Sequence, residues 1–161
     1  MRSLLLRRDS LEAIEHDARH AYPDEACGFL CSEADAADAP SRRITTVETA
    51  ANAYAGERRR RFVITPEELA AAEVRAGARG ELVSGFYHSH PDHPALPSAF
   101  DTEHAWPWYA YLVVAVDRRG LCSAAAFELD AEALRFLPRT LELYTPRVDG
   151  TSELAGPTST G

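Results

Sequence analysis

The sequence contains little cysteine and no long apolar run. Its three cysteines, Cys27, Cys31 and Cys122, are an odd number, and no second pair accompanies the C-x3-C spacing of the first two. We therefore expect free thiols in a reducing compartment, without a disulfide framework or a cysteine-based structural zinc site. The apolar part of the opening MRSLLLRR is too short for a signal sequence, and no stretch approaches a membrane-spanning length. We expect a soluble, cytoplasmic protein.

Positive charge is also scarce. The chain has 17 Lys+Arg against 25 Asp+Glu, for a formal net charge of -8. This balance disfavours nucleic acid as a partner, because phosphate binding needs a basic face. The exception is the run from Arg58 to Arg61. It is compatible with a solvated loop or with docking of an acidic protein partner, and the sequence leaves both interpretations open.

With 161 residues and 45% hydrophobic content, the chain is long enough for one domain with a buried core. Asp9 or Ser10 is expected to cap the first helix, and Thr65 followed by Pro66 is a strong start for the second. The patterns predict helices at 10–21, 66–79 and a short one from about 98, with strands at 26–31, 42–50, 61–64, 81–90, 109–117 and 121–129.

This alternation indicates an α/β fold, a single domain in which helices flank a mixed β-sheet. No internal repeat is visible. The domain is expected to span residues 1–144. Residues 145–161 are rich in Pro, Gly, Ser and Thr, and are expected to form a flexible C-terminal tail.

Four of the six histidines lie between residues 85 and 106. His88 and His90 are two apart at the end of a predicted strand, so their imidazoles share one face. Asp101 follows a proline-rich loop, and Ser98 lies three residues before it, on one helix face. Two imidazoles and a carboxylate suit Zn2+ with an open fourth position, as in catalytic sites. A polar loop with hydrogen-bonded histidines is the alternative.

The spacing His88-x-His90-x7-Ser98-x2-Asp101 resembles, without a gap, the H-x-H-x7-S-x2-D signature of the JAMM (MPN-domain) zinc metalloproteases. The segment DEACGFL is similar to the glutamate-bearing segment of that family and places Glu25 at its catalytic glutamate. Asn52 and RFVITPEEL look like features of short bacterial members. The resemblance covers roughly residues 8 to 137 and implies a cytidine-deaminase-like (JAMM/MPN) fold.

The resemblance implies that His88, His90 and Asp101 bind one zinc ion per chain. It implies that Glu25 moves a proton from the attacking water to the leaving amine, and that Ser98 hydrogen-bonds the oxyanion. The implied substrate is a ubiquitin-like protein or a ThiS- or MoaD-like sulfur carrier, cut after its C-terminal diglycine. The bond can be a peptide, an isopeptide or a carrier–cysteine adduct, and the sequence does not choose among them. Nor does it fix the oligomeric state or any need for an activating partner.

Several neighbouring residues have alternative interpretations. His93 and His104 are expected to surround the site without binding the metal, because three ligands and water complete a tetrahedron. Cys27 is expected to be a buried structural thiol. Trp106 and Trp108 are expected to pack in the core or at the rim of the site.

Two other functions compete with the hydrolase. A non-catalytic MPN-type scaffold would not need Glu25 and Ser98. A metal-dependent hydrolase or deaminase of a small molecule is the other, although deaminases normally add a C-x2-C pair, which is absent here.

Overall fold

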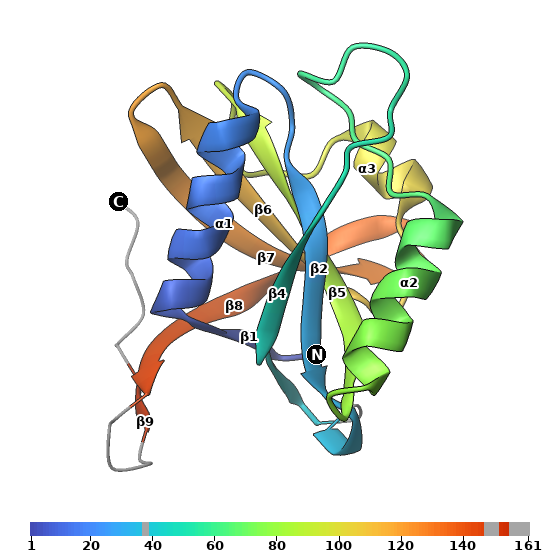
Figure 1. Ribbon diagram of the computed structural model, residues 1–161, viewed down its shortest axis with the longest axis vertical. Helices are drawn as coiled ribbons and strands as arrows, with labels where there is room; N and C mark the ends of the chain where they lie inside the picture. The colour runs from blue at the N-terminus through green and yellow to red at the C-terminus, as the bar shows by residue number, and fades with distance from the viewer. Residues whose placement is uncertain (37–38, 147–151, 155–161) are drawn as a thin grey trace.

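The computed structural model describes residues 1–36, 39–146 and 152–154 (Figure 1). Its elements are β1 (Ser3–Arg7), α1 (Arg8–Ala21), β2 (Cys27–Glu33), a 3-10 turn (Ala34–Ala36), β3 (Ser41–Arg43), β4 (Thr46–Ala50), α2 (Pro66–Gly77), β5 (Glu81–Pro91), α3 (Ala99–His104), β6 (Ala110–Asp117), β7 (Gly120–Asp130), β8 (Arg135–Pro146) and β9 (Ser152–Leu154).

The strands form one mixed sheet in the order β3-β1-β8-β7-β6-β5-β2-β4, with β9 paired to β8. β1 pairs in parallel with β3 and β8, and β5 pairs in parallel with β6, whereas the other pairs are antiparallel. The predicted α/β fold with a mixed sheet is therefore confirmed.

The helices cover the sheet from two sides (Figure 1). Successive residues of β6 point to opposite faces, so Val114 joins the core beside Ile14 of α1, while Val113 joins the core beside Ala72 of α2. Burial on both faces explains why the β6 sequence is almost continuously apolar. β5 and β6 are thus fixed in the centre of the molecule. The last residues of β5 carry the histidines.

The predicted start of α2 is confirmed, but the predicted cap of α1 is not. Thr65 caps α2 by accepting a hydrogen bond from the backbone N–H of Glu68 at 3.2 Å, and Pro66 takes the first helical position, as predicted. The expected side-chain cap of α1 is wrong. That helix begins after Arg7 without one, and Asp9 pairs with the Arg7 guanidinium instead.

Two strand predictions need correction. Residues 61–64 belong to no strand, because Phe62 stacks on His88 and the Val63 carbonyl accepts a hydrogen bond from the Ala53 N–H. The predicted strand 42–50 is two short strands, because β3 pairs with β1 and β4 pairs with β2.

The boundary expected at residue 144 falls inside β8, which continues through Pro146, and residues 152–154 pair with it as β9. The remainder of the expected tail, 147–151 and 155–161, lies outside the described residues. No helix in the described ranges has the length and apolarity that a membrane crossing requires.

Candidate active site

His88, His90 and Asp101 bring three metal-binding atoms together in the interior of the protein. The two Nε2 atoms lie 3.1 Å apart, and Oδ2 of Asp101 lies 3.4 Å from Nε2 of His88 and 3.6 Å from Nε2 of His90. A tetrahedral metal with bonds of about 2.0–2.1 Å has ligand–ligand edges of about 3.3–3.4 Å. The three observed spacings bracket that edge, so the donor set fits a zinc ion.

Neighbouring groups orient each imidazole. Nδ1 of His90 lies 2.8 Å from the carbonyl oxygen of Pro94, which can only accept, so the ring proton is on Nδ1 and Nε2 presents a lone pair. The His88 ring is stacked on Phe62, with centroids 4.6 Å apart and an interplanar angle of 23°. Both rings are buried and have defined directions.

Asp101 is fixed by the start of α3. The Ser98 N–H donates to Oδ2 of Asp101 at 2.6 Å, and the Asp101 N–H donates to Oγ of Ser98 at 3.1 Å, which is a capping box. The short helix after the proline-rich loop therefore presents this carboxylate to the two imidazoles. The Ser98 Oγ–H hydrogen is not used in this pair, because the oxygen acts there as acceptor.

The local electrostatics keep two of the three groups in their ligand forms. Burial lowers the pKa of His88, which favours the neutral imidazole. Burial alone would raise the pKa of Asp101, but the imidazoles of His88 and His90, 3.4 and 3.6 Å from its Oδ2, outweigh it and hold the pKa well below its usual range. His90 shifts the other way: burial opposes the shift, but the nearby Asp101 carboxylate and the Pro94 carbonyl raise its pKa overall.

Glu25 lies beside this cluster and is 2% exposed. Its Oε1 lies 3.9 Å from Nε2 of His90, and its Oε2 has no hydrogen-bond partner among the described residues. Burial raises the pKa of Glu25 to about 8, with His90 opposing and Asp101 adding to the rise. A buried carboxylate without a partner at a prospective metal site can exchange protons with a molecule bound there.

The backbone around Glu25 is tied down on both sides. Its N–H donates to the carbonyl of Arg58 at 2.8 Å, and its carbonyl accepts from the side-chain amide of Asn52 at 3.0 Å. The next N–H, that of Ala26, donates to Oγ of Ser89 at 2.8 Å. Ser89 therefore points away from the histidine face, as expected for the middle residue of an H-x-H strand, and links β5 to the glutamate segment.

The two remaining histidines of the 85–106 stretch differ. His104 is exposed, stacks on Phe100 and hydrogen-bonds the carbonyl of Phe100 through Nδ1 at 2.8 Å. His93 lies closer to the site than its sequence suggested. It stacks on His90 with centroids 4.2 Å apart, and its ring, His90 and Glu25 offer potential ligand atoms within 4.8 Å of one another. Sequence spacing carried no signal for this contact.

Cys27, Trp106 and Trp108 occupy structural positions. Cys27 is buried, and burial raises the pKa of its thiol to about 12, so it is not a thiolate nucleophile at neutral pH. Trp108 packs under the guanidinium of Arg42, which lies 4.4 Å from the ring centroid. Trp106 is half exposed, and its backbone N–H donates to the hydroxyl of Tyr111 at 2.7 Å.

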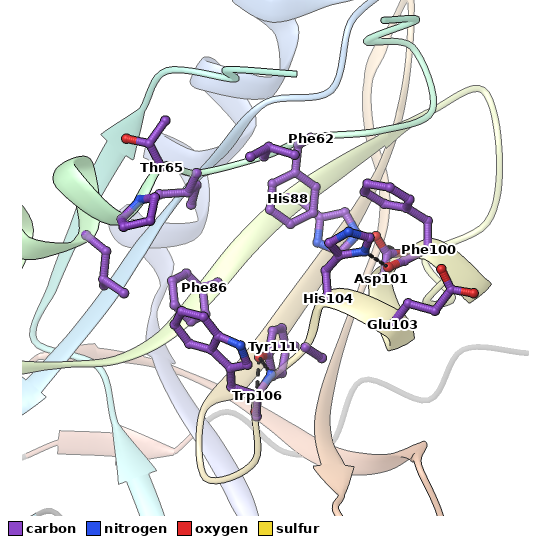
Figure 2. Close-up of a pocket in the computed structure, with 15 residues that line it drawn as sticks. Phe62, Thr65, Phe86, His88, Phe100, Asp101, Glu103, His104, Trp106 and Tyr111 are labelled. Carbon is purple, nitrogen blue, oxygen red and sulfur yellow. Dashed lines mark hydrogen bonds and ion pairs between the residues drawn. The ribbon is translucent and has the colours of Figure 1, made fainter. Parts of the chain in front are cut away.

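An apolar cavity of about 310 Å³ adjoins the histidine cluster (Figure 2). It lies between the segment leading into α2 and the helix α3, and His88 and Asp101 form part of its wall. Phe62, Phe100 and Trp106 provide aromatic surface around it. A peptide that reaches the ligand set therefore has an apolar surface next to it.

Comparison with known proteins identifies the family. Residues 7–129 match the family model described as prokaryotic homologs of the JAB domain. The chain belongs to the prokaryotic JAB family. Among curated relatives, a desampylase of Haloferax volcanii is 36% identical over 121 residues, which cover 72% of this chain and 83% of the relative.

Solved structures share the fold of this chain. A Desulfitobacterium hafniense protein matches with a TM-score of 0.76 and 25% identity, over 91% of this chain and 96% of its own. A Salinibacter ruber protein matches with a TM-score of 0.66 and 32% identity, over 94% and 95%. The JAB1/MPN domain protein of Archaeoglobus fulgidus, at 19% identity and a TM-score of 0.50 over 88% and 98%, shares the fold. The expected JAMM/MPN resemblance is confirmed.

Proposed function

We propose that this prokaryotic JAB protein is a zinc-dependent peptidase or isopeptidase. Its proposed substrate is a ubiquitin-like or ThiS/MoaD-like sulfur-carrier protein, cut after the C-terminal diglycine. The observation that carries the proposal is the buried carboxylate of Glu25, whose Oε2 has no hydrogen-bond partner among the described residues, beside the converging atoms of His88, His90 and Asp101. The relative named desampylase supports a hydrolase that acts on a protein modifier of the ubiquitin-like class.

The proposed metal site consists of His88, His90 and Asp101, with one zinc ion per chain. Bound zinc would supply Lewis acidity at the open fourth position. The protein's part is to hold the three donor atoms at tetrahedral spacing before the metal arrives, through the Pro94 carbonyl and the capping box of α3. Such preorganisation reduces the reorganisation that metal binding requires.

Glu25 is the proposed general base and acid. Its carboxylate takes a proton from the attacking water and delivers it to the amine that leaves. Two features support this role. Oε2 has no competing hydrogen-bond partner in the described ranges, and hydrogen bonds to Arg58 and Asn52 hold the backbone in place.

Ser98 is proposed to hydrogen-bond the oxyanion that forms as the carbonyl is attacked. Oγ accepts from the Asp101 N–H, so the hydroxyl hydrogen can donate to another oxygen. The same residue caps α3 and positions a ligand, so its replacement is expected to affect both zinc retention and rate.

The experiment that tests this function uses a ubiquitin-like protein carrying a short extension after its diglycine, and a second form joined through a lysine ε-amine. Zinc-loaded protein is incubated with each, and mass spectrometry identifies the bond that is cut. We expect a product ending in the diglycine from at least one form, and none after chelation. Tight binding without cleavage of either form would favour the scaffold alternative.

A further inference from the structure

The arginine run 58–61 divides into two pairs with different surroundings. Nε of Arg58 donates to the carbonyl of Tyr54 at 2.8 Å. Nη1 of Arg61 donates to the Tyr54 hydroxyl at 2.8 Å, and its guanidinium lies 5.0 Å from the Phe100 ring centroid. Arg59 and Arg60 are exposed and make no side-chain hydrogen bond or ion pair with the described residues. The outer pair, Arg58 and Arg61, therefore stabilises the loop. The inner pair, Arg59 and Arg60, is free to bind a ligand.

Arg59 and Arg60 face a second cavity of about 730 Å³. A third guanidinium, Arg118, reaches it from the turn between β6 and β7, so two loops distant in sequence converge there. The wall also contains Ser98 and His93, and it shares no residue with the apolar cavity. The two cavities thus adjoin the candidate active site through different residues.

The second cavity is lined by more positive than negative side chains, although the chain as a whole is acidic. Three arginines line it against two carboxylates, whereas the full sequence carries a net charge of -8. One of these carboxylates, Asp92, accepts a hydrogen bond from the Tyr22 hydroxyl at 2.7 Å, and the other is Glu57. The sequence contains no lysine, so every fixed positive side chain is a guanidinium, whose planar fork pairs with carboxylates in a bidentate manner.

The loop that carries the inner pair is anchored beside the proposed catalytic base. The Arg58 carbonyl accepts from the Glu25 N–H at 2.8 Å, and the Asn52 amide bonds both the Glu25 carbonyl and the Arg61 carbonyl at 3.0 Å. The distance from Arg59 and Arg60 to the reacting centre is therefore set by backbone contacts. A charged group bound by them would lie beside Ser98 and His93, which line the same cavity.

We propose that this arginine cavity, lined by Arg59, Arg60 and Arg118, binds an acidic side chain of the protein substrate. The inference rests on the proposed function and adds a specificity element to it. A substrate segment that crosses the ligand set meets an apolar surface in one cavity and a carboxylate-binding surface in the other. The preferred segment therefore carries Glu or Asp on one side of the diglycine bond.

The test uses internally quenched peptides with a central diglycine. Two of them carry a pair of glutamates, either before or after the diglycine, and matched peptides carry glutamines or lysines at the same positions. We expect the wild-type protein to cleave one glutamate peptide with roughly tenfold higher kcat/KM than its glutamine counterpart, mainly through KM. This preference should fall as ionic strength rises, because salt screens exposed charges.

The double variant Arg59→Glu/Arg60→Glu should lose that preference and gain one for the lysine peptide, a gain that misfolding cannot produce. Arg59→Lys/Arg60→Lys keeps the charge and should retain part of the preference. The control Arg8→Glu/Arg135→Glu makes the same charge change at exposed arginines outside the cavity and should behave as wild type.

Fluorescence anisotropy of the same peptides separates this inference from the proposed function. If no peptide is cut, but the glutamate peptide binds more tightly and loses this advantage in the charge-reversed variant, carboxylate recognition stands and the peptidase proposal fails. If peptides are cut or bound equally well whatever their charge, the arginine cavity has no such role and the inference is overturned.

Discussion

The side-chain amide of Asn52 donates a hydrogen bond to the backbone carbonyl of Glu25 at 3.0 Å. The same amide donates to the Arg61 carbonyl at 3.0 Å, and its oxygen accepts from the N–H groups of Tyr54 and Val63. One side chain thus ties the glutamate segment to both ends of the loop that covers the site. Asn52 positions the proposed base without reaching the metal ligands.

The variant Asn52→Asp keeps the accepting oxygen but loses the two donated bonds. Displacement of a catalytic group by a fraction of an ångström is costly, so we expect kcat to fall about tenfold. Zinc content should stay close to wild type, because the three proposed ligands are unchanged. Steady-state kinetics with metal analysis checks this. An unchanged kcat would mean that Asn52 serves the loop alone.

Zinc binding should depend on the three converging residues and not on nearby histidines. We expect purified protein to contain about one zinc per chain. His88→Ala or Asp101→Ala should lower the zinc occupancy strongly, because each variant leaves only two of the three proposed ligands. His104→Ala is the matched control, because His104 is exposed and packs on Phe100. Folded wild-type protein that cannot take up zinc would contradict the proposed site.

The sequence predicted the contacts of this site that are local in the chain and missed those that are not. The shared face of His88 and His90 follows from strand periodicity. The three-residue spacing predicted that Ser98 and Asp101 are neighbours on a helix face, whereas in the structure Ser98 caps α3 and its Oγ accepts from the Asp101 N–H. The approach of Glu25 depends on pairing between β2 and β5, which no local pattern encodes, and only the family resemblance suggested it. The contact of His93 with His90 depends on how the loop after β5 turns back, and neither argument indicated it.

The same distinction holds for the fold. Residues 66–77 and the β6–β7 hairpin carry complete local signals and were predicted. β1 is a short apolar run whose strand character comes from its parallel neighbours β3 and β8, and β8 itself was not predicted. Residues 61–64 have strand-like composition, but Phe62 stacks on His88 and the segment covers the site.

The thiols should differ in reactivity by burial. Burial raises the pKa of Cys27 to about 12 and that of Cys31 to about 11, so both stay protonated and enclosed at pH 8, whereas Cys122 is exposed. We expect a colorimetric disulfide reagent to titrate one thiol rapidly in native protein and three after denaturation. Cys122→Ser should remove the rapid phase. Rapid loss of activity on modification in that variant would reopen a nucleophilic role for Cys27.

Gly28 is expected to be intolerant of any side chain. A Cβ atom there would collide with the Glu48 carbonyl oxygen and the Tyr87 ring, between which β2 is packed. Gly28→Ala should lower the free energy of unfolding by about 1–3 kcal/mol, as overpacking does. Gly77→Ala is the control: its Cβ would meet no described atom within 4 Å, and it lies at the end of α2, so we expect no loss of stability. Chemical denaturation measures both, and equal effects would contradict the packing argument.

Turnover by zinc-loaded Glu25→Gln protein tests the central proposal most directly. Glutamine preserves the shape of the side chain but cannot accept and return the proton, and Glu25 is not among the proposed ligands. With zinc content equal to wild type, we predict that kcat on a diglycine-linked substrate falls by about 10²–10⁴. A kcat indistinguishable from that of wild type at equal zinc content would contradict the assignment of Glu25 as the general base.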